Sequence, residues 1–211
     1  MQNLIPFLVG LIVALTVEWV GVTAASNQGC CPASAPVQHS VALASKADPM
    51  SSVDTDEIRR AFNTSSQRVR IVALLSPTCR GCQSGHTTIA KVLGKFSSPK
   101  LQAILVWEPT IEGDSAEAAS QQAATLRDTR IVQGWNENRN LGTLFGETLD
   151  LHAVGWDVYL VYKPGIRWEG KQPPQPTFWM HQLNGADPKL PLCADPTRLS
   201  AEVGKLLEQA H

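Results

Sequence analysis

The chain has almost no excess of charge of either sign. Its 211 residues include 18 Lys and Arg against 19 Asp and Glu, a formal net charge of −1. Such a chain has no general attraction for a phosphate backbone, which argues against a nucleic-acid-binding protein. Internal repeats are also lacking. Hydrophobic residues make up 43% of the chain and charged residues 18%. This composition is typical of one globular domain with additional segments.

Basic residues are missing from the start of the chain, where the first is Lys46. Residues 4–17 carry no charge, and the apolar character resumes after Glu18. Two interpretations remain open. One is a signal peptide that could be cut after Ala24. The other is an uncleaved membrane anchor over residues 4–25, long enough to span a bilayer at about 20 residues. Both predict an extracytoplasmic location for the globular part, periplasmic, secreted or anchored to the membrane.

The chain is therefore expected to have three segments: a signal peptide or membrane anchor over 1–25, a flexible linker over 26–53, and a folded domain over 54–211. The linker is rich in Ala, Ser, Pro and Gln, as flexible linkers are. It contains the adjacent Cys30 and Cys31, which fit a soft-metal site, a partner for another thiol, or a lipid attachment point. Cys193 stands alone, and in an oxidising compartment it could pair with either of them.

The five cysteines include only one Cys-x-x-Cys pair, Cys79 and Cys82. Residues 69–75 before it form an apolar run with β-branched residues, short enough for a buried strand. Residues 76–78 end this strand and offer side-chain oxygens to cap a helix. Apolar residues then recur at helical spacing at Ile89, Val92, Leu93 and Phe96. The pattern places Cys79 in the first turn of a helix and Cys82 one turn further on the same face.

This placement has a chemical consequence for Cys79. Backbone N–H groups at a helix N-terminus carry partial positive charge and stabilise an anion. Together with the neighbouring Arg80, they predict a pKa for the Cys79 thiol below the free value of about 8.5. Cys82 lies within reach to close a disulfide. A structural disulfide or half of a zinc site is the alternative, but a four-cysteine zinc site needs a second Cys-x-x-Cys pair, which this chain lacks.

A strand, a turn and Cys-Arg-Gly-Cys at the start of a helix resemble the redox motif of the thioredoxin-like superfamily. The resemblance implies an α/β, thioredoxin-like fold, with a central mixed sheet flanked by helices. It also implies a thiol–disulfide oxidoreductase that needs no cofactor and works through Cys79 and Cys82. Its partners would be protein thiols or disulfides, with a membrane or soluble electron donor or acceptor.

The rest of the folded domain shows the element order that this resemblance implies. Asp54 and Glu57 resemble a capping box that starts a first helix, and Asp195-Pro196 would open the last one. The elements expected between them are strands at 69–75, 101–107, 131–132 and 157–162, a strand at 166–168 that closes a hairpin, and helices from Cys79, from Asp114-Ser115 to about Asp128, and over 141–149.

Three positions depart from thioredoxin itself. Ala73 stands where thioredoxins carry a buried aspartate, and Thr78 stands where they carry a tryptophan before the first cysteine. Asp157 falls at the position of their cis-proline, and a cis bond before a non-proline residue costs ~3 kcal/mol. Asp157 could turn outward at the start of its strand. Alternatively, it faces the cysteine pair, replaces the missing acid as a proton acceptor and joins the two cysteines as a catalytic residue.

A different class of function uses the same cysteines to carry metal. His86 follows Cys82 by four residues and could share a helix face with the pair. Two thiolates and an imidazole would suit copper(I) or zinc, with His152 or His181 as a further ligand. The alternative for His86 is a partly buried histidine bonded to a carbonyl. The protein would then be a soft-metal binding or carrier protein of thioredoxin-like fold; a redox-inert interaction domain is a third possibility.

Residues 168–192 form a proline- and aromatic-rich stretch, too long for an idle connection. We expect either a flap over the domain or hydrophobic cover for a sheet edge.

Overall fold

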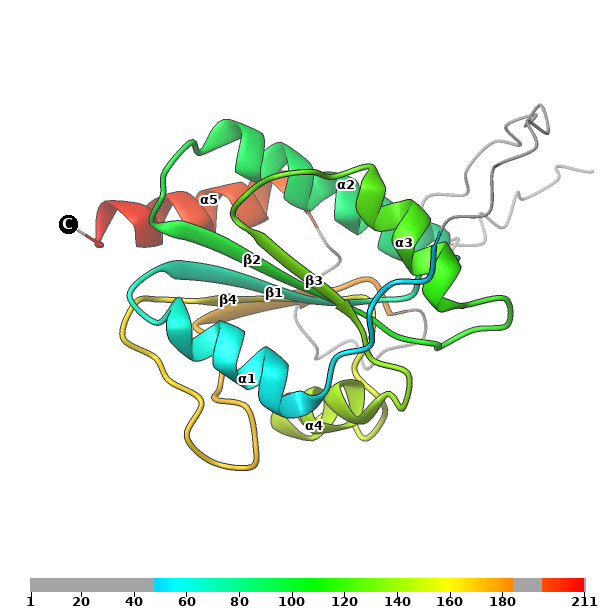
Figure 1. Cartoon of the computed structure of the whole chain (residues 1–211). Coiled ribbons are helices and arrows are strands. Elements are labelled where there is room, and N and C mark those ends of the chain that lie inside the picture. Colours follow the sequence, from blue (N-terminus) through cyan, green and yellow to red (C-terminus); the bar gives the residue numbers. More distant parts are fainter. Residues whose placement is uncertain (1–47, 184–194, 211) are drawn as a thin grey trace, which may run out of the picture.

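The structure is a computed structural model that describes residues 48–183 and 195–210. Its centre is a five-stranded sheet in the order β3-β2-β1-β4-β5 (Figure 1). Strands β1, β2 and β3 are parallel, β4 is antiparallel to β1, and β5 is antiparallel to β4. The strands are Val69–Leu75 (β1), Leu101–Trp107 (β2), Ile131–Trp135 (β3), Val158–Tyr162 (β4) and Phe178–His181 (β5). The helices are Thr55–Thr64 (α1), Arg80–Lys95 (α2), Ala116–Ala124 (α3), Asn140–Thr148 (α4) and Pro196–Glu208 (α5).

Helices cover both faces of this sheet. Helices α2, α3 and α5 lie on one face, and α1 and α4 lie on the other (Figure 1). Each face has its own hydrophobic core, one built around Ile89 and Leu199 and one around Phe62 and Phe145. Every residue of β1 and β2 is buried, which explains their continuous apolar runs, because a central parallel strand is covered on both sides. The fold is thioredoxin-like, as the sequence predicted.

Helices α1 and α5 start at the predicted capping residues, whereas the start of α3 differs from the prediction. Asp54 caps α1 in a capping box with Glu57, and Asp195 caps α5, with Pro196 at its start. The start of α3 differs: Ser115 is its N-cap and accepts a hydrogen bond from the Ala118 backbone N–H. The prediction that Asp114 shares this role was wrong, because its carboxylate accepts hydrogen bonds from a neighbouring loop.

The predicted hairpin partner of β4 was also wrong. Residues 166–168 form no strand, and β5 pairs with β4 instead, from Val158 opposite His181 to Val161 opposite Phe178. Residues 166–168 are held by side-chain hydrogen bonds rather than by backbone pairing with a strand. Asn63 of α1 exchanges two hydrogen bonds with the Trp168 backbone. Within residues 168–183, the described part of the proline- and aromatic-rich stretch, residues 178–181 form edge strand β5.

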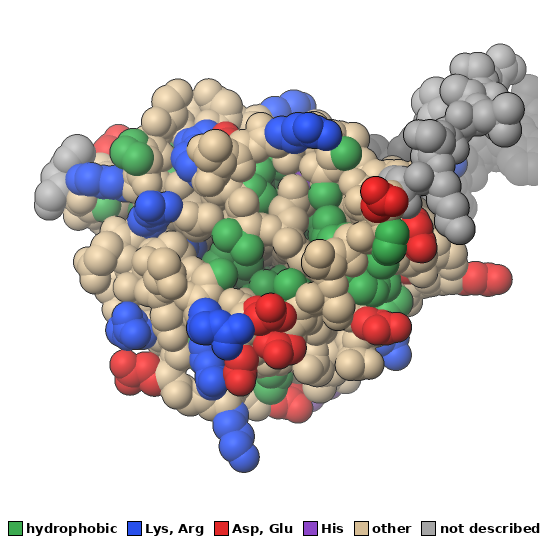
Figure 2. All heavy atoms as spheres, viewed as in Figure 1, with side chains coloured by type: hydrophobic (Ala, Val, Ile, Leu, Met, Phe, Trp, Pro, Cys, Tyr) green, Lys and Arg blue, Asp and Glu red, His purple; other side chains and the backbone are tan. Residues whose placement is uncertain are grey.

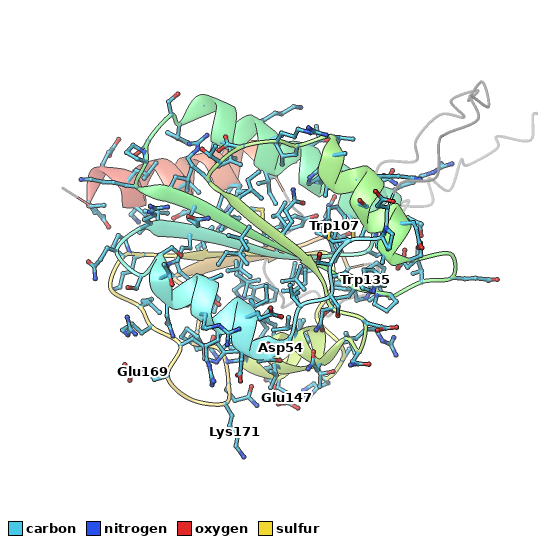
Figure 3. All side chains as sticks on the ribbon, in the orientation of Figure 1. Asp54, Trp107, Trp135, Glu147, Glu169 and Lys171 are labelled. Carbon is cyan, nitrogen blue, oxygen red and sulfur yellow. The ribbon has the colours of Figure 1, made fainter. Side chains whose placement is uncertain are left out.

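Arg70 completes the anchoring of this segment from the centre of the sheet. It is fully buried in β1 and donates hydrogen bonds to the backbone carbonyls of Phe62, Lys163 and Ile166. Its guanidinium lies 4.2 Å from the centre of the Phe62 ring. Burial lowers the pKa of Arg70 to about 10, with the Tyr162 phenol opposing this shift. Beyond these anchors, the side chains of Glu169 and Lys171 point away from the body of the protein (Figure 3).

Edge strand β3 closes the other side of the sheet. Trp135 pairs with Trp107 of β2, and the two labelled side chains lie near each other at the ends of these strands (Figure 3). Hydrophobic side chains gather in the middle of the face that carries this edge, with charged side chains of both signs around them (Figure 2). Val132 of β3 and Ile111 are the large hydrophobic residues that are exposed in the described part.

The predicted N-terminal segments lie outside this structure. Residues 1–25, all but the end of the linker over 26–53, and Cys30, Cys31 and Cys193 are not among the residues that it describes. Within the described ranges, no helix combines the length and the hydrophobicity needed to cross a bilayer.

Candidate functional site

The cysteine pair lies where β1 ends and α2 begins. Cys79 is the N-cap residue of α2, and Cys82 lies in its first turn. The predicted capping by residues 76–78 was wrong, because no side-chain oxygen caps this helix. Their oxygens are used elsewhere: the hydroxyls of Ser76 and Thr78 both donate to the Asp114 carboxylate. The first backbone N–H groups of α2 therefore face Cys79 without a competing side-chain cap.

Asp114 holds the turn before Cys79 against the loop after β2. Besides the two hydroxyls, it accepts hydrogen bonds from the backbone N–H groups of Thr78, Thr110 and Ile111. Burial alone would raise the pKa of Asp114, but these hydrogen bonds outweigh it and lower the pKa. Asp114 was not predicted as part of the site.

The two thiols have opposite electrostatic environments. Both are free; Cys79 is half-buried and Cys82 is buried. The pKa of Cys79 is lowered to about 7, first by a hydrogen bond from the Cys82 thiol and then by the backbone N–H groups of Cys82 and Gly81, against burial and the Asp157 charge. The predicted lowering of the Cys79 pKa is confirmed, and so is the predicted contribution of the backbone N–H groups at the start of the helix. Arg80 is not among the groups that lower this pKa.

Cys82 is held as a protonated thiol. Burial is the largest cause that raises its pKa well above the ordinary value, followed by its hydrogen bond to Cys79 and the charge of Asp157. Its sulfur also accepts a hydrogen bond of 3.3 Å from the Ser76 backbone N–H. At neutral pH, the arrangement therefore favours a thiolate at Cys79 and a thiol at Cys82.

Asp157 faces the cysteine pair, so its outward orientation is excluded. Its carboxylate and the two sulfurs lie within 4.8 Å of one another. No peptide bond in the described residues is cis, and Asp157 instead has a φ of +53°. Its N–H donates to the Leu74 carbonyl, and its carbonyl accepts from the Gln182 N–H, so both neighbouring strands hold its backbone. Burial raises the pKa of Asp157, opposed by hydrogen bonds from Tyr159, Gln182 and Cys82.

Two further side chains complete the site, and neither was predicted from the sequence. The Tyr159 hydroxyl donates to Asp157 Oδ1 at 2.6 Å. Gln182 Nε2 lies 3.2 Å from the same oxygen, 3.2 Å from the Tyr159 hydroxyl and 2.9 Å from the Gly81 carbonyl oxygen, between the cysteines. Neither residue belongs to a recognisable motif.

Two glycines of α2 make room for this group. A Cβ at Gly81 would lie 2.6 Å from Asp157 Oδ2, and a Cβ at Gly85 would lie 1.5 Å from the Tyr159 hydroxyl oxygen. The glycines are four residues apart and share one face of the helix. Close approach of β4 to α2 thus requires both of them to lack a side chain.

The predicted histidines are not part of this group. Within the described residues, Cys79, Cys82 and Asp157 are the one set of three side chains close enough to share a metal ion. His86 is buried against Trp107, with ring centres 5.3 Å apart, and its Nε2 has no hydrogen-bond partner in the structure. His152 is exposed beside Asp150. His181 lies in edge strand β5, where its Nδ1 accepts from the Leu183 N–H.

No family model matches the chain, and no curated protein matches it. Solved structures with a similar fold include DsbF from Mycobacterium tuberculosis in mixed oxidised and reduced forms, with 13% identity, 70% of this chain and 84% of that chain covered, and a TM-score of 0.44. A secreted disulfide oxidoreductase from the same organism, homologous to E. coli DsbE, has 12% identity, coverages of 68% and 85%, and a TM-score of 0.41.

A third similar structure is the thioredoxin domain of a thiol–disulfide oxidoreductase from Bacteroides vulgatus. It has 15% identity, coverages of 79% and 98%, and a TM-score of 0.41. At these identities and TM-scores, no conclusion about this chain is drawn from the similar structures.

Proposed function

We propose that this protein is a thiol–disulfide oxidoreductase that exchanges disulfides with protein substrates through Cys79 and Cys82, with Asp157 as the proton acceptor. The observation that carries the proposal is the asymmetry of the pair. A half-buried Cys79, with its pKa lowered to about 7, lies beside a buried Cys82 that contacts a carboxyl group. An attacking thiol works best when its pKa is near the ambient pH.

In the reducing direction, the Cys79 thiolate attacks one sulfur of a substrate disulfide. The substrate S–S bond breaks, and a mixed disulfide forms between Cys79 and the substrate. Asp157 then takes the proton of Cys82, and the Cys82 thiolate attacks the Cys79 sulfur. This step closes the Cys79–Cys82 disulfide and releases the second substrate sulfur as a thiolate. The two substrate thiolates take up one proton from Asp157 and one from solvent, so the substrate leaves as a dithiol that has gained two electrons. The same steps in reverse oxidise a dithiol substrate.

The Asp157 carboxylate takes the place of the acid that is missing at Ala73. Ala73 of β1 pairs with Tyr159 of β4, and Asp157 lies two residues before Tyr159, just ahead of β4. The acid therefore reaches the buried thiol from the start of the neighbouring strand. Burial, which raises the pKa of Asp157, brings its basicity closer to that of a thiol and favours proton transfer.

We place this activity outside the cytoplasm, because the apolar residues 4–25 are typical of an export signal or anchor. Disulfide exchange with structural disulfides belongs to such oxidising compartments. The electron donor or acceptor would be another thiol–disulfide protein, soluble or in the membrane.

Trapping the mixed disulfide tests the proposal. In Cys82→Ser the resolving thiol is absent, so we expect a stable mixed disulfide between Cys79 and a disulfide substrate, seen by mass spectrometry. Cys79→Ser is the matched control and should trap none through the pair, because the other thiol of the pair, Cys82, is buried and its pKa is raised. Equal trapping by both variants, or none by either, would contradict the proposed roles.

Metal carriage by the same cysteines is the competing function. The predicted set with His86 is not brought together, and a metal would have to bind the two sulfurs and the Asp157 carboxylate. One oxygen of that carboxylate already accepts two hydrogen bonds. Metal analysis of the purified full-length protein separates the two functions: one equivalent of copper or zinc, without detectable disulfide exchange, would favour the carrier.

A further inference from the structure

The two oxygens of the Asp157 carboxylate face different partners. Oδ1 accepts the Tyr159 hydroxyl and lies within hydrogen-bond distance of Gln182. Oδ2 points toward α2, where the position of a Cβ on Gly81 would be 2.6 Å from it. One oxygen is thus held from the sheet, and the other is presented to the first turn of the cysteine helix. A carboxylate with both oxygens unrestrained could rotate and lose this orientation.

Tyr159 acts on Oδ1 as a donor. It is fully buried, and burial raises the pKa of its phenol well above the ordinary value, followed by the charges of Asp157 and Cys82. The phenol therefore keeps its proton throughout the physiological range and donates to the carboxylate. It can occupy this place only because Gly85 has no side chain.

Gln182 links the carboxylate to the first turn of α2, which carries the cysteines. Its side-chain amide donates to the Gly81 carbonyl oxygen at 2.9 Å, and its backbone N–H donates to the Asp157 carbonyl oxygen at 3.0 Å. Gly81 lies between the two cysteines, while Gln182 directly follows β5. The Gln182 side chain and backbone therefore join the first turn of α2 to Asp157, and these two segments must keep their relative positions during exchange.

We infer that Tyr159 and Gln182 are positioning residues for the resolving step: they hold one oxygen of Asp157 so that the other stays directed at the cysteine pair. This inference rests on the proposed function. It assigns no chemistry to either residue, since neither touches the substrate. Their effect reaches the reaction through the orientation and the basicity of Asp157.

The expected direction of the effect follows from the hydrogen bond. Within the described residues, the titratable groups that interact with Asp157 are Cys79 and Cys82 from the start of α2 and Tyr159 from β4. A donor to a carboxylate stabilises its charged form and lowers its pKa. Loss of the Tyr159 hydroxyl should therefore raise the pKa of Asp157, by roughly one unit for one hydrogen bond to a charged group.

The experiment compares two tyrosine-to-phenylalanine variants of the same strand. Tyr159→Phe removes the hydroxyl that holds Asp157. Tyr162→Phe is the matched control, since Tyr162 is equally buried in β4 but its hydroxyl donates to the Pro174 carbonyl. Gln182→Leu removes the amide link at similar volume. Two measurements are made on the reduced full-length protein: the Asp157 carboxyl titration by ¹³C NMR, and the rates of Cys79 alkylation and mixed-disulfide resolution against pH.

In Tyr159→Phe we expect the Asp157 titration and the midpoint of the resolving step to move up together by about one pH unit. At a pH well below the midpoint, resolution should then be about tenfold slower, because a smaller fraction of Asp157 is ionised. Gln182→Leu should move both quantities in the same direction. Alkylation of Cys79 should stay close to the wild-type rate in every variant, and Tyr162→Phe should shift neither quantity.

Equal shifts in Tyr159→Phe and Tyr162→Phe, or an unchanged resolving step in Tyr159→Phe, would overturn the inference. Failure of the proposed function has a different signature: the wild-type protein would resolve no mixed disulfide at any pH. If the carboxyl titration still moved in Tyr159→Phe, the hold of Tyr159 on Asp157 would stand while its role in exchange would be lost.

Discussion

Asp114 shows how one side chain can fix the position of a reactive cysteine without touching it. It accepts hydrogen bonds from both sides of a junction, namely the turn before Cys79 and the loop after β2. Thr78, whose backbone N–H and hydroxyl donate two of these hydrogen bonds, directly precedes Cys79. The carboxylate thereby replaces the missing helix cap as the group that orders this turn.

Asp114→Ala should lower the free energy of unfolding by about 2–4 kcal/mol, because several backbone and hydroxyl donors lose their shared charged acceptor at once. Urea denaturation under reducing conditions measures the change. Alkylation of Cys79 should also slow, since the turn no longer holds the thiol against the N–H groups of α2. Glu112→Ala, in the same loop but exposed, is the control and should leave both quantities nearly unchanged. Equal losses in the two variants would mean that Asp114 has no special role.

How far the site could be predicted depends on the sequence separation of its residues. Cys79 and Cys82 were predicted because strand, turn and helix are consecutive. For Asp157, the sequence left two orientations open, one outward and one toward the cysteine pair. Tyr159 and Gln182 could not be predicted, because their roles arise from packing against α2, many residues earlier. Asp114 was misjudged for a similar reason: a local cap and a distant loop compete for the same carboxylate.

At the scale of elements, α2 is shaped by the close approach of β4. Gly85 in the middle of this helix is buried, and the Tyr159 hydroxyl occupies the space where a Cβ would lie. Gly94, near the end of the same helix, is exposed and has no atom within 4 Å of its Cβ position. Alanine substitutions at these two glycines therefore test the effect of helix propensity and the effect of packing separately.

Gly94→Ala should raise the free energy of unfolding by up to about 1 kcal/mol, because alanine favours the helix over glycine. Gly85→Ala gains the same propensity but places a methyl group 1.5 Å from the Tyr159 hydroxyl oxygen. The clash should outweigh the propensity, with a net loss of about 1–3 kcal/mol. Thermal unfolding of the two variants is the measurement. A stabilised Gly85→Ala protein would show that Tyr159 does not lie against this helix.

The strands illustrate why one element was misplaced. The central strands were predicted because their apolar runs are continuous, as full burial requires. Residues 166–168 follow β4 after a Pro-Gly turn, which favoured a tight hairpin. The buried Arg70 guanidinium instead binds the carbonyls of Lys163 and Ile166, so this backbone is satisfied without a strand. The sequence around Arg70 gives no local sign that its side chain binds the backbone of a segment more than ninety residues later.

At the scale of the whole molecule, the described residues include one buried carboxyl group on each face of the sheet, and neither forms an ion pair with another described residue. Asp157 lies on the side of α2 and serves the proposed exchange. Glu108, just after β2, lies on the side of α4 and is fully buried. Its Oε1 accepts a hydrogen bond from the Gly142 backbone N–H in the first turn of α4, while its Oε2 has no hydrogen-bond partner among the described residues.

Burial is the main cause that raises the pKa of Glu108 from 4.5 to about 8, against the hydrogen bond from Gly142 and the charge of Arg139. The folded protein therefore keeps the Glu108 proton up to about pH 8, whereas the unfolded chain loses it near pH 4.5. Between these values the folded state binds more protons, so Glu108 makes the free energy of unfolding fall as pH rises, by up to about 1.4 kcal/mol per pH unit. Above about pH 8 this contribution is lost and the dependence ends.

Glu108→Gln removes this titration while keeping the volume and an oxygen for the Gly142 N–H. We expect the variant to lose less stability than the wild type between pH 5 and pH 8, in urea denaturation under reducing conditions. The comparison uses the difference between the two proteins, because Asp157 also titrates with a raised pKa and is common to both. Glu208→Gln, at an exposed position of α5, should keep the wild-type pH dependence. Parallel curves for wild type and Glu108→Gln would show that Glu108 is ionised in the folded protein at neutral pH, and that the contact between β2 and α4 holds a carboxylate rather than a neutral acid.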